Sequence, residues 1–146
     1  MILMRAIIVY NTMTGNTRDL ASKMKNVLEK FDIEADIYPD NKIKNKVRTS
    51  KTFFESYELL CFGSCTHAWA PALSFSSFLN IVKKHELSGK KLICFATSAS
   101  STAWQDTCKY IKRRFPNLEH LGNFGCSNRN STNTLQEFSK LKIKKK

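Results

Sequence analysis

Short, continuous apolar runs alternate with amphipathic segments along this chain of 146 residues. Runs such as Ala6–Tyr10 and Leu92–Ala96 are entirely apolar, which is typical of strands buried on both faces of a parallel sheet. Strands are expected at residues 4–10, 33–38, 57–63, 92–96 and 120–124.

The segments between these strands carry apolar residues at helical spacing. Leu20, Met24 and Leu28 follow one another four residues apart, which places them on one face of a helix. Further helices are predicted at residues 75–82, at 104–115, and from Thr132 or Asn133 to about Leu141.

One connection lacks a clear apolar period. Residues 39–50 are therefore predicted to form a polar loop, with a short helix at 52–56. The alternation of strands with helical segments predicts the α/β class, with a parallel sheet covered by helices on both faces.

A hydroxyl-rich turn, Thr12-Met13-Thr14-Gly15-Asn16-Thr17, follows the first predicted strand and opens the first helix. N–H groups at a helix start favour an anion, and glycine lets the backbone approach it closely. No Lys follows the glycine, which excludes the phosphate loop of nucleotide triphosphatases. No G-x-G-x-x-G is present, which excludes the dinucleotide-binding fingerprint. The turn therefore suits a phosphate monoester held by hydrogen bonds. The alternative is an ordinary helix start capped by Thr14 or Asn16.

At this turn the chain resembles the flavodoxin family, whose FMN phosphate loop reads Ser/Thr-x-Thr-Gly-x-Thr directly after the first strand. The resemblance implies a flavodoxin-like three-layer sandwich around a five-stranded parallel sheet of order 2-1-3-4-5. The length, and the absence of repeats or a Pro/Gly-rich linker, predict a single domain over residues 1–146. The resemblance also implies that FMN binds at the carboxyl ends of the strands, on the loops after strands one, three and four.

The second of these loops is Gly63–Pro71. Similar proteins often have Gly-Ser-Pro here, followed by an aromatic turn and a proline, and Cys65 replaces the first proline. Trp69 is expected to stack on the flavin, or else to plug the core against the next helix. His67 is expected either near the flavin or simply exposed.

The third loop, residues 97–104, is small and polar, although Trp104 also fits the core stripe of the following helix. The residues expected to bind FMN are Thr12, Met13, Thr14, Gly15, Asn16, Thr17, Ser64, Cys65, Thr66, His67, Ala68, Trp69, Thr97, Ser98, Ala99, Ser100, Ser101 and Thr102.

The charge balance departs from the acidic surface that the resemblance implies. Lys and Arg number 24 against 12 Asp and Glu, a net charge of +12, with basic clusters at 42–51 and in the tail at 140–146. These clusters are either solvated surfaces or docking sites for an acidic protein, nucleic acid or an anionic membrane. We expect a monomer that meets a redox partner protein with an acidic surface, and we do not expect nucleic acid binding.

Several classes of protein and site are excluded. The five cysteines form no C-x-x-C motif, which predicts reduced thiols in a cytoplasmic protein. The histidines have no acidic or cysteine partner at ligand spacing, so no metal site is expected. No signal peptide or membrane span is expected. Response-regulator receivers need carboxylates where this chain has Tyr10-Asn11, and small tyrosine phosphatases need an Arg that follows neither Cys61 nor Cys65 at the required spacing.

The sequence therefore favours an FMN-binding electron-transfer protein. A carrier needs one exposed flavin edge and a docking surface, whereas an enzyme usually needs an added pocket wall. Two alternatives remain: a flavodoxin-fold binding or regulatory module that has lost FMN, and an FMN-dependent oxidoreductase that acts on a small substrate.

Overall fold

The computed structural model describes residues 4–127. The final predicted helix and the basic tail at 140–146 lie outside these residues. Within them the strands are β1 (Arg5–Asn11), β2 (Glu34–Pro39), β3 (Leu59–His67), β4 (Ala70–Pro71), β5 (Lys91–Ser98) and β6 (Glu119–Ser127). The helices are α1 (Asn16–Lys30), α2 (Asp40–Thr49), α3 (Leu73–Val82) and α4 (Ala103–Arg114).

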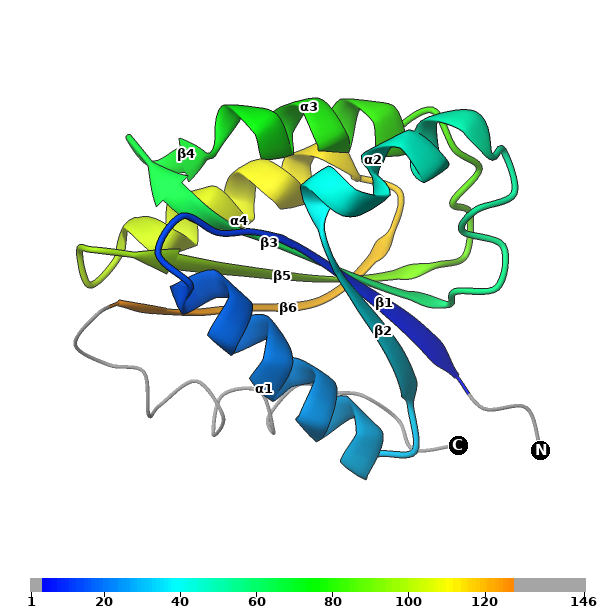
Figure 1. Ribbon diagram of the computed structural model, residues 1–146, viewed down its shortest axis with the longest axis horizontal. Helices are drawn as coiled ribbons and strands as arrows, with labels where there is room; N and C mark the ends of the chain where they lie inside the picture. The colour runs from blue at the N-terminus through cyan, green and yellow to red at the C-terminus, as the bar shows by residue number, and fades with distance from the viewer. Residues whose placement is uncertain (1–3, 128–146) are drawn as a thin grey trace.

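The main sheet is parallel and has the order β2-β1-β3-β5-β6, with the short β4 paired antiparallel to β3. Figure 1 shows α2, α3 and α4 on one face of the sheet and α1 on the other. The expected flavodoxin-like α/β fold is thus confirmed, because the strand order is the predicted one once β4 is set aside.

Two apolar clusters hold the three layers together. Successive side chains of a strand point to opposite faces, so Val9 packs under α2–α4 while its neighbour Ile8 packs under α1. The predicted helix face is confirmed, since Leu20, Met24 and Leu28 of α1 are all buried against the sheet.

The prediction of a loop at 39–50 was wrong. Residues 40–49 form α2, which buries Ile43 and Val47 one turn apart and exposes Lys42, Lys46 and Arg48. The short helix expected at 52–56 is instead a series of turns.

Three strands are longer at their carboxyl ends than expected. β3 runs to His67, β5 to Ser98 and β6 to Ser127. Polar side chains such as Thr97 and Ser98 are buried there, so polarity did not mark the strand ends.

The predicted reduced thiols are present. None of the five cysteines forms a disulfide, and Cys61, Cys94 and Cys108 are buried in the core. Burial disfavours the thiolate and raises the pKa of all three thiols.

Gly63 allows an aromatic ring to lie flat against the centre of the sheet. It pairs in register with Phe95 of β5, and a Cβ atom at position 63 would come within 2.1 Å of the Phe95 ring. That ring stacks on Phe124 of β6 at a centroid separation of 6.1 Å. The close approach therefore requires a residue without a side chain.

We expect Gly63→Ala to lower the free energy of unfolding by about 1–3 kcal/mol, because the added methyl group overpacks the core. Urea denaturation measures this change. The same substitution in a Phe95→Leu background should cost less, because the clashing ring is gone. An equal cost in both backgrounds would show that the ring contact is not the cause.

Candidate functional site

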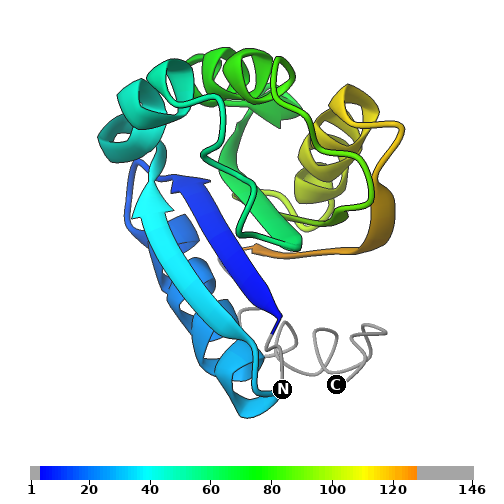
Figure 2. The ribbon, with the colours of Figure 1, turned by 90° about the vertical axis from the view of Figure 1, so that its right-hand side faces the viewer.

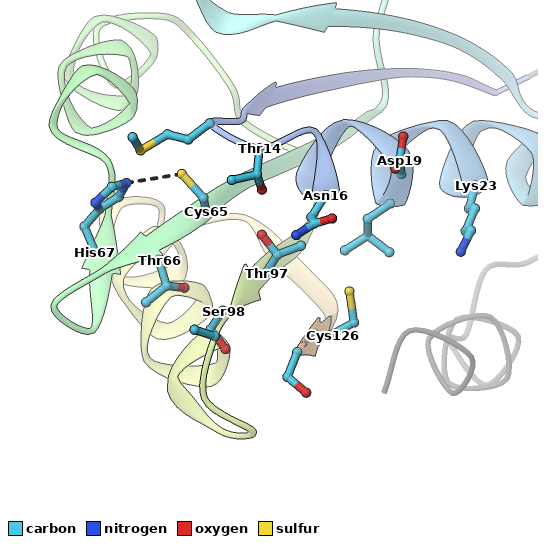
Figure 3. Close-up of a pocket in the computed structure, with 14 residues that line it drawn as sticks. Thr14, Asn16, Asp19, Lys23, Cys65, Thr66, His67, Thr97, Ser98 and Cys126 are labelled. Carbon is cyan, nitrogen blue, oxygen red and sulfur yellow. Dashed lines mark hydrogen bonds between the residues drawn. The ribbon is translucent and has the colours of Figure 1, made fainter. Parts of the chain in front are cut away.

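A cavity of about 600 Å³ opens at the carboxyl ends of the parallel strands (Figure 3). Its size is that of a typical small-molecule or cofactor site. It is lined by Met13, Thr14, Asn16, Asp19, Leu20, Lys23, Cys65, Thr66, His67, Thr97, Ser98, Ala99, Cys126 and Ser127.

The turn between β1 and α1 forms one wall of the cavity. Gly15 is the N-cap of α1 with a φ of 93°, and its N–H donates to Thr12 Oγ1 over 3.0 Å. No side chain caps the helix, so the alternative of a Thr14 or Asn16 cap does not hold. Both of these side chains instead line the cavity (Figure 3).

Thr17 faces the protein interior. It is fully buried, and its hydroxyl lies 2.8 Å from the hydroxyl of Thr97. This bond joins the first turn of α1 to the end of β5. The structure therefore brings Thr97, but not Thr17, to the cavity wall.

The loop after β3 is a tight hairpin. His67 and Ala70 pair across a two-residue turn, in which Ala68 and Trp69 both have positive φ, 48° and 63°. Such a turn favours Gly or Asn, and a tryptophan in this region is strained. Trp69 is 68% exposed and does not line the cavity, so it does not plug the core.

The strand before this hairpin presents a thiol and an imidazole to the cavity. Cys65 Sγ lies 3.4 Å from His67 Nε2 (Figure 3). It also donates to Asn11 Oδ1 over 3.4 Å. Burial raises the pKa of Cys65. Ser64, one residue earlier, is buried and accepts the N–H of Ala72, which fixes the chain at the start of α3.

Asn11 also anchors the first turn of α2. Its Nδ2 donates to Asp40 Oδ2 over 3.1 Å and to Ser74 Oγ over 2.9 Å. Burial raises the pKa of Asp40, and the hydrogen bond from Asn11 partly opposes that rise. The end of β1 thereby holds α2, α3 and the Cys65 thiol in one network.

Thr97 and Ser98 at the end of β5 and Ala99 after it line the cavity, and residues 100–102 lead into α4. Ser98 Oγ accepts the N–H of Trp104, and Ser100 Oγ accepts the N–H of Ala103. Trp104 is half-buried against the core, as its place in the helical stripe suggested.

Half of the residues predicted to bind the cofactor line the cavity, and some lining residues were not predicted. The predicted residues that lie outside the lining are Thr12, Gly15, Thr17, Ser64, Ala68, Trp69, Ser100, Ser101 and Thr102. The lining residues that were missed are Asp19, Leu20, Lys23, Cys126 and Ser127. Helical spacing from Asn16 would have suggested Asp19 and Lys23, whereas β6 gave no signal.

Comparisons with known proteins agree with this geometry. A protein named probable flavodoxin 1, from Bacillus subtilis (strain 168), is 28% identical over 96 residues, which are 64% of this chain and 56% of that protein. The structure of a flavodoxin from the domain Archaea has a TM-score of 0.73 at 18% identity, over 94% of this chain and 93% of that chain. This chain has the flavodoxin-like fold.

The flavodoxin-like fold also occurs inside longer proteins. A flavodiiron core, Flv1 from Synechocystis sp. PCC6803, matches 92% of this chain with a TM-score of 0.77 at 14% identity, but only 33% of that chain is covered. No family model matches this sequence. The alignment spans little more than half of the Bacillus relative.

Within 4–127 no group of three His, Cys, Asp or Glu side chains is placed to hold a metal ion. None of the helices in this range has the length and apolar content needed to cross a bilayer.

The buried Asp40 should make stability depend on pH. Because its pKa is raised on folding, the folded state retains the proton longer, and stability should fall as pH rises from the ordinary carboxyl pKa of 3.8 through the folded value. We expect Asp40→Asn to flatten this part of the curve of unfolding free energy against pH. Urea titrations at several pH values test this, with exposed Asp106→Asn as control. An unchanged slope in Asp40→Asn would contradict the assignment.

Proposed function

We propose that this chain binds FMN and transfers electrons to and from partner proteins. One observation carries the proposal: the turn after β1, the start of α1 and the carboxyl ends of β3, β5 and β6 of a flavodoxin-like fold line a cavity whose side chains are mainly hydroxyl, amide and small. The likeness to proteins named flavodoxin supports the choice of cofactor.

The phosphate of FMN is assigned to the start of α1. Thr14 and Asn16 line the cavity there, and the first turn of the helix has no side-chain cap. The first-turn N–H groups and the helix dipole favour the phosphate charge. Thr12 and Thr17 belong to the same motif but support the site without lining it. The Thr12 hydroxyl accepts the N–H of Gly15, and the Thr17 hydroxyl is hydrogen-bonded to that of Thr97.

The isoalloxazine ring is assigned to the opposite part of the cavity, between the carboxyl ends of β3 and β5. Thr66 and His67 line one side, and Ser98 and Ala99 the other. FMN, when bound, supplies one- and two-electron redox chemistry. The chain orients the ring and limits its contact with water, and Trp69 would cover it only if the hairpin tip turned inward.

An electron carrier is favoured over an enzyme with its own substrate. The short connections between the described elements add no second wall to the cavity, which leaves a bound ring accessible to another protein. The occurrence of the fold within a flavodiiron chain supports a module that works beside other redox centres. The cytoplasmic location and the monomeric state remain predictions.

The phosphate assignment predicts the effect of Thr14→Ala. Losing one hydrogen bond to a charged acceptor should weaken FMN binding about tenfold or more. Riboflavin, which lacks the phosphate, should bind the parent protein much more weakly than FMN and respond little to the substitution. Titrations followed by flavin fluorescence measure both affinities.

Thr102→Ala is the matched control, because Thr102 is exposed and lies outside the cavity lining. Equal affinity of the parent for FMN and riboflavin would contradict the phosphate site. A purified protein that shows no flavin absorption and takes up no FMN would favour the module that has lost its cofactor.

The stacking of Trp69 is tested separately. If the hairpin tip closes over the ring, Trp69→Ala should restore part of the quenched flavin fluorescence and weaken binding by about 1–3 kcal/mol, by analogy with base stacking on aromatic side chains. Leu73→Ala, which alters another exposed apolar side chain, is the control. Unchanged fluorescence and affinity in Trp69→Ala would show that the tryptophan stays outward.

A further inference from the structure

A second cavity, of about 370 Å³, lies at the end of α4 that is remote from the candidate cofactor site. Phe115 and Leu118 pack against the core, while Lys109, Lys112 and Arg113 line the cavity from the helix. We call this the α4 groove; its lining residues are Lys109, Lys112, Arg113, Phe115, Pro116, Leu118 and His120. Figure 2 shows α4 at the border of its layer, next to the chain that leads into β6.

The three cations of the groove share one helix face. Lys112 and Arg113 stand three and four residues after Lys109, so like charges are neighbours and repel one another. The helix dipole favours cations in the last turn but not as far back as Lys109. An anionic partner would relieve this repulsion.

These cations have no acidic partner within the described residues. The ion pairs found there involve Arg5, Arg18, Lys25 and Lys91, and none of these lies on α2, α3 or α4. The neighbouring Arg114 is different, because it donates to Asn80 Oδ1 and to the Tyr110 hydroxyl. The groove thus differs from the other side of the same helix, where the guanidinium group of Arg114 is hydrogen-bonded.

We propose that the α4 groove docks an acidic segment of a partner protein. An apolar side chain of that segment enters the groove above Phe115 and Leu118, and its carboxylates pair with Lys109, Lys112 and Arg113. Charge complementarity selects this occupant. A second copy of this chain is disfavoured because its net charge is also +12.

Nucleic acid fits the groove less well than an acidic protein segment. Proteins that bind single strands combine cations with exposed aromatic rings on which bases stack. Two side chains of the groove carry rings, Phe115 and His120. Phe115 is only 6% exposed, so bases cannot stack on it. The imidazole of His120 is engaged by Asn123 at 2.7 Å.

The proposal adds a docking site to the electron-transfer function without depending on FMN. A partner bound at the far end of α4 leaves the first cavity open, so the same chain can be tethered while its cofactor edge stays accessible. The two sites are therefore testable one at a time.

The test uses a short fluorescently labelled peptide of Asp and Glu with one central Leu, titrated with the full chain and followed by anisotropy. Lys112→Glu/Arg113→Glu should weaken peptide binding about tenfold or more. Lys83→Glu/Lys84→Glu makes the same change in net charge on exposed residues outside the groove, and should have little effect. A peptide with Ser in place of Leu should bind the parent protein more weakly.

Equal losses in the two double variants would overturn the proposal, because net charge alone would then explain binding. Heparin, RNA or anionic phosphatidylglycerol vesicles that bind more tightly than the peptide, with the same sensitivity to Lys112→Glu/Arg113→Glu, would also overturn it. Circular dichroism checks folding, and Lys109→Gln/Lys112→Gln replaces the charge reversal if that variant unfolds. FMN titration of the same variants reports separately on the proposed function.

Discussion

The register of the parallel sheet is the constraint on which the rest of the structure depends. Asn11 pairs with Ser64, Cys65 with Thr97, and Thr97 with Cys126, so the ends of four strands reach the same edge. A shift by one residue would turn every side chain of a strand to the other face. The apolar residues that fix this register therefore decide which polar groups meet at the cavity.

Hydrogen bonds between threonine hydroxyl groups fix the strand ends that form the cavity wall. Thr17 bonds to Thr97, and Thr66 bonds to Thr107 at 2.8 Å, so each pair joins a helix to a strand end. Across the described residues no buried side-chain nitrogen or oxygen lacks a hydrogen-bond partner. A threonine in a binding motif can therefore serve the site by holding the backbone and not by touching the ligand.

The apolar pattern was sufficient to predict the strands of the sheet and three of the described helices. The strand order was predicted from the family resemblance. The apolar pattern failed at α2, where Ile43 and Val47 are the buried apolar residues of a helix otherwise polar and rich in lysine. It also failed to locate Trp69, because Ala-Trp is not a sequence that signals a turn with two positive φ angles. Whether a polar residue at a strand end belongs to the strand depends on tertiary burial, which periodicity does not report.

The distribution of thiols has a consequence for chemical durability. Three of the five cysteines are sealed in the core with raised pKa values, and a protonated, inaccessible thiol is a poor target for peroxides. Cys65 and Cys126 line the cavity instead. Oxidative damage from solvent would thus begin at the cavity wall and not in the packing, and a molecule seated in the cavity would shield both sulfur atoms.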